Sequence, residues 1–370
     1  MGIVAEPITV KVTREILELL TTENNTAVYI SHLYDLETKK YNLSSDGKLS
    51  FKNDLKTAGV ADDIINREVV RFQTWLSQKD YSGNQLTGKG FITIFGIKFD
   101  ELTGDFEDFK TLVEAKLSEK KNGKPVVDFY AVVTSLKTVE ANIFFRQLGD
   151  NLLKMFIGEK TQIIDLDPGE KGNYSLYIAN KKPEEYKADA LLARTIFGPL
   201  NTNFNRRNLY DVTADDVNDD EYQTAKANNI MLVLYAPGSD AQTEGDFMSI
   251  ENPVTKAHHR RIIDSIIFAI IQTLARLLPR DDMSLDDRPN GGLDKISSAL
   301  NKLMLEYDRM NCLTRINDVP QFDVILPELS SITPTERRKG LLSGVKVRVM
   351  PIDFINAIEI NLIWEEDTFI

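Results

Sequence analysis

Three short stretches contain the residue types that bind ions or phosphate groups. Residues 87–90 (TGKG) combine glycine and lysine, but they precede a predicted strand and lack the Gly-Lys-Ser/Thr ending of a phosphate-binding loop. Residues 165–169 (DLDPG) begin like a calcium loop, but no glutamate stands at the twelfth position, which favours a plain turn. Residues 258–261 (HHRR) have the types that hold an anion or a metal. Because successive helix residues point to different faces, we expect a solvated helix start there.

Carboxylates are concentrated in residues 213–222 (TADDVNDDEY). Such a group of acids has the composition of a cation site. It also has the composition of a helix N-cap with an acidic first turn, where negative charge complements the helix dipole. We favour the N-cap, which requires no metal.

Other signatures of catalysis are missing. The chain has no Gly-x-Ser-x-Gly elbow, no His-Glu-x-x-His pair and no Cys-x-x-Cys pair, and it contains three histidines and one cysteine. No nucleophile therefore has an obvious general base. We predict a protein that is not an enzyme and that needs no cofactor or metal. The alternative, a small-molecule enzyme on a doubly wound α/β domain, would require a glycine-rich turn between a strand and a helix, and none is visible.

Composition narrows the class of protein further. The 370 residues are 42% hydrophobic and 27% charged, with a net charge of −12, which is typical of a folded protein with a large core. An acidic chain repels phosphate, so we expect no nucleic-acid partner. The single cysteine, Cys312, excludes an internal disulfide. We expect no secretion signal in residues 1–20 and no membrane insertion, because the most apolar stretch, residues 262–278, is short and interrupted by charge; we predict a buried core helix there.

The first half of the chain alternates apolar strand-like runs with helical periodicity. This order predicts βαβ units around a largely parallel sheet, and hence an α/β (α+β) fold. The predicted strands are residues 27–33, 91–97, 126–133, 161–166 and 174–179. The predicted helices are residues 60–77, 106–119, 139–156 and 183–197.

A polar, asparagine-rich stretch at residues 198–208 indicates a change of domain. After it we predict an acidic helix, a strand at residues 230–235, the apolar helix and a second helix with one apolar stripe. The final predicted elements are strands at 322–326, 345–350 and 357–364 and a short basic helix at 333–342.

Both ends of the chain contain strand-like segments without a hairpin partner. Such strands pair either with the parent sheet or with an open edge of another molecule, and the pattern alone leaves both alternatives open. The alternating apolar residues that would fill pockets are Ile8, Val10 and Val12 in the first segment and Ile358, Ile360, Leu362 and Trp364 in the last.

Charge is segregated near the C-terminus. Residues 333–350 contain five basic residues and one acidic residue, a net charge of +4, whereas residues 353–370 carry −5. The basic segment suits an acidic partner, and the acidic tail suits docking elsewhere. An internal charge match between the two segments is the alternative.

The order of several segments resembles the tail sheath proteins of contractile-tailed bacteriophages, the myoviruses. The resemblance covers about the last 170 residues, and more loosely residues 28–77 and 91–97, whereas residues 100–205 depart from the family pattern. The segments that carry it are 209–222 (LYDVTADDVNDDEY), 226–230 (KANNI), 243–248 (TEGDFM), 278–280 (LPR), 291–296 (GGLDKI) and 335–339 (TERRK).

The resemblance implies a structural subunit that polymerises helically around an inner tail tube and contracts to drive the tube through the host cell envelope. It implies that residues 8–13 and 357–364 are strands donated to neighbouring subunits. It also implies a tube-facing helix, best matched by Glu336, Arg337, Arg338 and Lys339. The expected partners are further copies of the chain, the tube protein, and baseplate and tail terminator proteins, in a virion assembled in the host cytoplasm. A non-sheath structural protein of a tail or injection machine remains an alternative.

The same resemblance implies a division of the chain into four parts. Residues 1–22 would be an N-terminal strand arm, and residues 23–205 an α/β region that is partly outward-facing. Residues 206–352 would form the sheath domain, and residues 353–370 a C-terminal strand arm.

Overall fold

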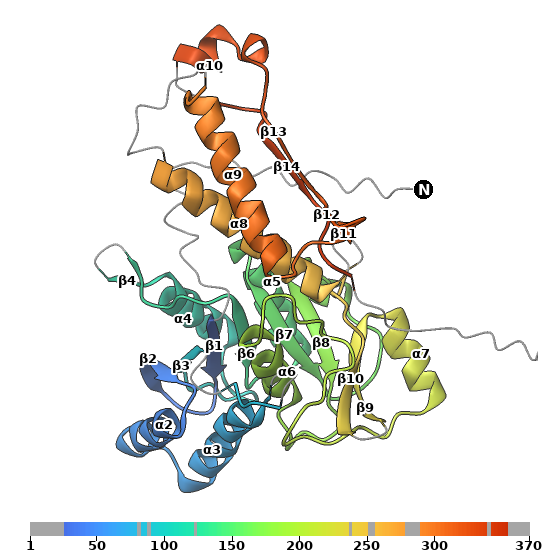
Figure 1. The fold of residues 1–370 in the computed structure, drawn as a ribbon. Coiled ribbons are helices and arrows are strands. Elements are labelled where there is room, and N and C mark those ends of the chain that lie inside the picture. The colour runs from blue at the N-terminus through green and yellow to red at the C-terminus, as the bar shows by residue number, and fades with distance from the viewer. Residues whose placement is uncertain are drawn as a thin grey trace, which may run out of the picture.

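An eight-stranded sheet forms the centre of the computed structural model (Figure 1), which describes residues 26–79, 83–86, 90–121, 124–236, 239–250, 256–277, 289–338 and 342–353. The strand order is β10-β9-β8-β7-β6-β1-β3-β2. The six inner strands pair in parallel, and the outermost strands, β2 and β10, are antiparallel to their neighbours. The bounds are β1 Thr26–Ser31, β2 Leu36–Asn42, β3 Phe91–Gly96, β6 Ala131–Thr134, β7 Met155–Lys160, β8 Ser175–Ala179, β9 Ile230–Ala236 and β10 Ser239–Glu244. The predicted α/β fold is confirmed.

Helices cover both faces of this sheet (Figure 1). One face packs against α2 Ser45–Thr57, α3 Asp62–Ser77 and α6 Lys187–Ile196, and the other against α4 Phe106–Ser118, α5 Val139–Leu152 and α7 Asp219–Ala227. Strand β1 shows why both faces need a covering layer of helices. Its side chains alternate between the faces, so Ala27 and Tyr29 belong to one core and Val28 and Ile30 to the other. A strand buried on both faces is therefore mainly apolar, and each large apolar side chain that it buries contributes about 1.5–3 kcal/mol.

Side-chain caps fix where several helices begin. The carboxylate-rich run is such a cap: the Asn218 side chain accepts from the Glu221 N–H at 2.9 Å, and the Glu221 carboxylate accepts from the Asn218 N–H at 3.0 Å. The N-cap interpretation of residues 213–222 is therefore confirmed. Asp215, from the same run, is instead buried against the ammonium group of Lys187 at 2.6 Å.

The stretch that begins like a calcium loop is a turn, as predicted. Its residues form a short 3-10 turn, η1 Pro168–Glu170, that is capped by Asp167. The carboxylate of Glu170 is buried and accepts two bonds of 2.9 Å from the Lys160 ammonium group. Of the glycine-rich stretch, residues 87–89 lie outside the described residues.

Two predicted elements between residues 139 and 166 are wrong. Helix α5 ends at Leu152, because Leu153 adopts a left-handed conformation (φ 56°) and its N–H bonds the Gly149 carbonyl. The next strand is β7, which is wholly buried, whereas the predicted strand at 161–166 is irregular. An apolar run of this length fits a helix end and a buried strand equally well, so periodicity misplaced the boundary.

Other differences involve polar elements. Strand β2 and helix α2 were missed, since β2 (LETKKYN) is an edge strand with mainly exposed side chains. The helix predicted at 183–197 begins later, at Lys187, so Pro183 does not occupy its first turn. The sheet also extends across the boundary predicted at 205/206, because β9 and β10 belong to it. The four-part division of the chain stays a prediction.

The remaining described strands form three two-stranded antiparallel sheets. They are β4 Lys120–Lys121 with β5 Lys124–Pro125, β11 Arg315–Ile316 with β12 Val319–Pro320, and β13 Phe322–Ile325 with β14 Lys346–Val349. A second 3-10 turn, η2 Leu329–Ser331, follows β13.

Candidate functional site: the C-terminal projection

The elements after residue 256 form a projection that extends away from the sheet (Figure 1). This C-terminal projection consists of α8 Ala257–Leu277, α9 Gly292–Arg309, α10 Pro334–Arg338, the β11–β12 pair, η2 and the β13–β14 ribbon. Its own small core contains Ile262, Ile266, Met304 and Tyr307 and is separate from the two cores of the sheet. Helix α8 is thus a core helix only in its first half; beyond Ile266 most of its side chains are half-buried, which corrects the prediction of a fully buried helix.

Arg261 attaches the first turns of α8, which are the root of the projection, to the end of α6. Its side chain is fully buried, and the guanidinium group donates to the carbonyl oxygens of Pro199 (2.8 Å), Ile196 (2.9 Å) and Gly198 (3.0 Å). These carbonyls lie at the C-terminal end of α6, where backbone acceptors lack partners and a cation is favoured. Burial lowers the pKa of Arg261 to about 10. The solvated helix start predicted for residues 258–261 is therefore wrong.

A second buried link joins α8 to the sheet. The Asp264 carboxylate accepts from the hydroxyl of Tyr130 (3.0 Å), next to β6, and from that of Tyr174 (3.3 Å), next to β8. The Arg260 guanidinium lies over the Tyr174 ring, 4.6 Å from its centroid, and 3.7 Å from Asp264. Burial raises the pKa of Asp264 to about 6. This part of α8 thus makes hydrogen bonds both to α6 and to residues next to β6 and β8. The central sheet with its covering helices is called the body.

Helix α9 and the ribbon pack on the outer part of α8. The Ser265 and Tyr307 hydroxyls are 2.7 Å apart across the two helices. In the ribbon, Phe322, Val324, Val347 and Val349 contact this core, and the alternate residues Asp323 and Arg348 are exposed and opposite each other. A two-stranded ribbon needs such a partner to be stable.

Helix α10 lies at the far end of the projection (Figure 1). The Glu336 carboxylate accepts from the hydroxyl of Ser343, from the hydroxyl of Thr333 (2.7 Å) and from the Thr333 N–H (2.8 Å). These bonds lower the pKa of Glu336 to about 2. Glu336 is therefore occupied in holding the start of α10. Arg337 and Arg338 belong to this helix, but their side chains, and all of Lys339, lie outside the described residues.

The predicted strand arms also lie outside the described residues: Ile8, Val10 and Val12 at one end, and Ile358, Ile360, Leu362 and Trp364 at the other. The structure does place the points where the described chain begins and ends. The Thr26 carbonyl accepts from the N–H of Tyr130, whose hydroxyl reaches Asp264 on α8. At the other end, Ile352 bonds the Cys312 carbonyl at 2.9 Å, and Asp353 lies 3.5 Å from His259 of α8. Both ends therefore lie at the root of the projection.

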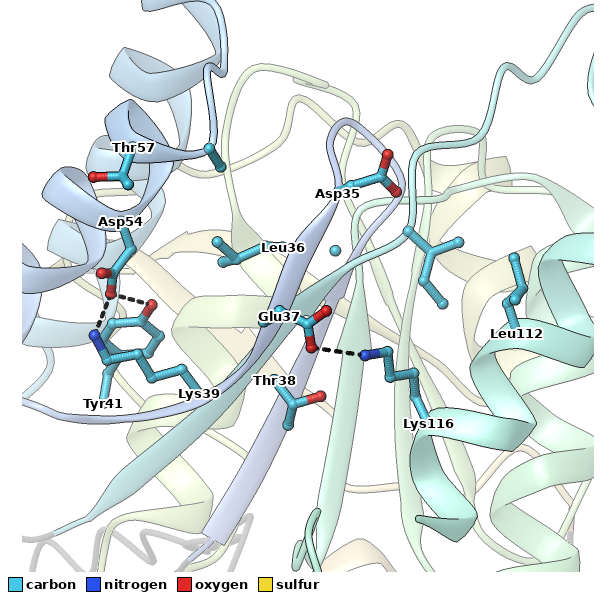
Figure 2. Close-up of a pocket in the computed structure, with 13 residues that line it drawn as sticks. Asp35, Leu36, Glu37, Thr38, Lys39, Tyr41, Asp54, Thr57, Leu112 and Lys116 are labelled. Carbon is cyan, nitrogen blue, oxygen red and sulfur yellow. Dashed lines mark hydrogen bonds and ion pairs between the residues drawn. The ribbon is translucent and has the colours of Figure 1, made fainter.

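An open groove of about 650 Å³ lies along β2 at the edge of the sheet. Lys39 and Tyr41 both donate to the Asp54 carboxylate of α2, at 2.6 and 2.7 Å, and Lys116 of α4 donates to the Glu37 carboxylate at 3.0 Å. Figure 2 marks these three interactions. These pairs connect the edge strand to helices on either side. The lining therefore supplies paired charges, not a nucleophile with a converging base.

Sequence reasoning missed the buried links at the root. The available signal was the placement of Arg260, Arg261 and Asp264 within an otherwise apolar helical stretch, where an unpaired charge would be costly. Among the described residues, none of the helices combines the length and apolar content needed to cross a bilayer.

Solved structures match this arrangement over nearly its whole length. A chain of the anti-feeding prophage helical sheath in its contracted state has a TM-score of 0.65 and 9% identity, and the match covers 99% of this chain and 100% of that one. A chain of the 6-fold symmetrised anti-feeding prophage baseplate has a TM-score of 0.65, with 10% identity and 98% of both chains covered. The chain has the fold of a contractile sheath protein.

A third structure with this sheath fold is the PVC sheath complex of an extracellular contractile injection system, in its contracted state. Its TM-score is 0.62, with 9% identity and 99% of both chains covered. Neither a protein-family model nor a curated protein sequence matches the chain. At such low identity the sheath fold is visible in the order and packing of elements, because many different apolar sequences fill the same core.

Proposed function

We propose that the chain is the structural subunit of a contractile sheath that polymerises helically around an inner tail tube and contracts to drive the tube through a host cell envelope. The observation that carries this proposal is the extent of the structural match, which covers 99% of this chain and 100% of the anti-feeding prophage sheath chain. A general α/β domain would match the sheet alone, whereas this match includes the C-terminal projection.

Assembly would use the two predicted strand arms. Both described ends are linked to α8 at the root of the projection, and we propose that the arms leave from there. In the described residues the β13–β14 ribbon has only two strands, and its outer edges are available for further pairing. Arms from neighbouring subunits would extend such an edge through main-chain hydrogen bonds, with alternate side chains filling pockets. A head-to-tail contact of this kind, if it does not close, builds an open helix.

Contraction would then be a rigid-body motion of subunits that stay tied by their arms. The buried bonds of Arg261 and Asp264 hold body and projection together as one unit, which suits rotation as a block. The free energy would be stored at assembly, so the mechanism uses no cofactor or catalytic residue.

The proposed partners are further copies of the chain, an inner tube protein, and baseplate and tail terminator proteins. The proposed setting is a phage tail, part of a virion that is assembled in the host cytoplasm. A second candidate is an extracellular injection machine, which is favoured by the matches to the anti-feeding prophage and the PVC system. Particles purified from the native source distinguish them, because a phage tail is attached to a DNA-filled head and an injection machine is not.

Electron microscopy of the purified full chain tests the sheath proposal. Under assembly conditions we expect hollow, striated tubes with helical order. Protein that stays monomeric across protein concentrations and salt conditions, alone and with its tube protein, would contradict the proposal. A globular closed oligomer would support the non-sheath alternative instead.

A further inference from the structure

The described chain ends beside two adjacent histidines. His258 and His259 occupy the first turn of α8, and their ring centroids are 4.3 Å apart. The segment of Ile352 and Asp353 passes directly next to both rings. This cluster is distinct from the buried links of Arg261 and Asp264.

The ring nitrogens converge on one position. The Nε2 atoms of His258 and His259 each lie 3.1 Å from the carbonyl oxygen of Ile352, and His259 Nε2 lies 3.5 Å from a carboxylate oxygen of Asp353. One ligand atom from each histidine and from Asp353 lies within 4.8 Å of the others. Tetrahedral zinc, with ligands at about 2.0–2.2 Å, holds its ligand atoms roughly 3.3–3.6 Å apart, so modest side-chain movements close the site.

Asp246 orients the buried ring of His258. Its carboxylate accepts from the His258 backbone N–H at 3.2 Å and also contacts ring Nδ1. With Asp246 against Nδ1, the opposite ring atom, Nε2, points toward the Ile352 carbonyl oxygen at 3.1 Å and toward the same position as His259 Nε2. The carboxylate–histidine pair is also the usual outer support of a metal-bound imidazole.

We propose that His258, His259 and Asp353 form a site for a divalent transition metal, with Zn²⁺ the best-suited ion, and that Asp246 orients His258. Two imidazoles and one carboxylate are a ligand set that zinc takes in proteins, and the Ile352 carbonyl supplies a nearby fourth oxygen. Lys256, which contacts the Asp353 carboxylate, gives up that contact when the metal binds. The bound ion ties the start of the predicted C-terminal arm to α8.

Metal binding by the full, tag-free chain tests this site. After dialysis against a chelator, titration with Zn²⁺ followed by calorimetry should give one ion per chain, and Co²⁺ should give the intense visible absorption of a four-coordinate site. His259→Gln and Asp353→Asn should each abolish this binding. His32→Gln is the matched control, because His32 contacts Ser135 and Glu101 at another part of the fold and should leave the binding unchanged. Circular dichroism confirms that each variant is folded.

Asp246→Asn separates orientation from direct ligation. It should keep the stoichiometry but weaken Zn²⁺ binding by about 10- to 100-fold, the usual effect of losing an outer carboxylate. Zn²⁺ bound equally by His259→Gln would overturn the proposal, since the ion would then lie elsewhere. A parent chain that binds no Zn²⁺ would also overturn it. These measurements concern the isolated chain and do not depend on sheath assembly.

Discussion

A single buried cation carries much of the connection between body and projection. Arg261 has no exposed surface and donates to three carbonyl oxygens at the end of α6. Loss of the guanidinium would leave these carbonyl oxygens without that donor. A hydrogen bond from a charged donor contributes about 1.5–3 kcal/mol to folding stability. The stability of the root therefore depends on this polar side chain as well as on its apolar neighbours.

Arg261→Met tests this directly. Methionine keeps most of the apolar stem but donates no hydrogen bond, so we expect the free energy of unfolding to fall by about 3 kcal/mol, measured by urea denaturation. Arg276→Met, on the exposed last turn of the same helix, is the control and should change stability by less than about 0.5 kcal/mol. Equal denaturation midpoints for the two variants would show that the α6 carbonyls do not need Arg261.

At the scale of elements, the sequence predicted most of those with a clear apolar period or a short, well-bounded apolar run. Helices α3, α4 and α9 and strands β1, β3, β8 and β9 were found because apolar residues recur with a clear period or in a short continuous run. Edge strand β2 was missed because its side chains are mainly exposed, so its pairing with β3 leaves almost no apolar pattern. The end of α5 depended on the backbone conformation of Leu153, which no apolar period records.

The candidate site was harder to predict than the fold. The resemblance to sheath proteins led to the C-terminal segment, and the structure confirmed the sheath fold. The order of residues could not show that Glu336 caps its own helix or that Arg261 reaches α6, since both depend on contacts formed only after packing. The roles of the terminal strands stay predictions.

Deletion of residues 357–370 tests the C-terminal arm as an element. The truncated chain retains Ile352 and its bond to Cys312, so we expect a folded, soluble protein with an unchanged circular dichroism spectrum. It should form no tubes in electron microscopy, because the donated strand is missing. As a control, Glu365→Gln, Glu366→Gln and Asp367→Asn remove tail charge but keep residues 357–364, and this variant should assemble. Tubes of normal length from the truncated chain would rule out the arm.

At the scale of the whole molecule, two proposed contacts start from opposite ends of the projection. The described chain begins and ends at the root, where the strand arms would leave, whereas α10 lies at the far end (Figure 1). Residues 336–339 contain three basic residues and one acidic residue, so the net charge that this segment would offer a partner is basic. Contacts with neighbouring subunits and with the tube should therefore respond to different substitutions.

Neutralising the basic helix separates the two contacts. In Arg337→Gln/Arg338→Gln/Lys339→Gln, binding to an acidic face of the tube protein should weaken about tenfold at low salt, because positive charge at the interface is lost. Sheath-to-sheath polymerisation should persist, because the arms are intact. The measurements are co-sedimentation with tube protein and electron microscopy.

The control variant Lys56→Gln/Lys171→Gln/Lys226→Gln makes the same change in net charge at exposed positions of the body, and it should leave tube binding and sheath polymerisation unaffected. Equal tube binding by the two triple variants would remove α10 from the tube contact, and loss of sheath polymers in the first variant would assign α10 to contacts between subunits.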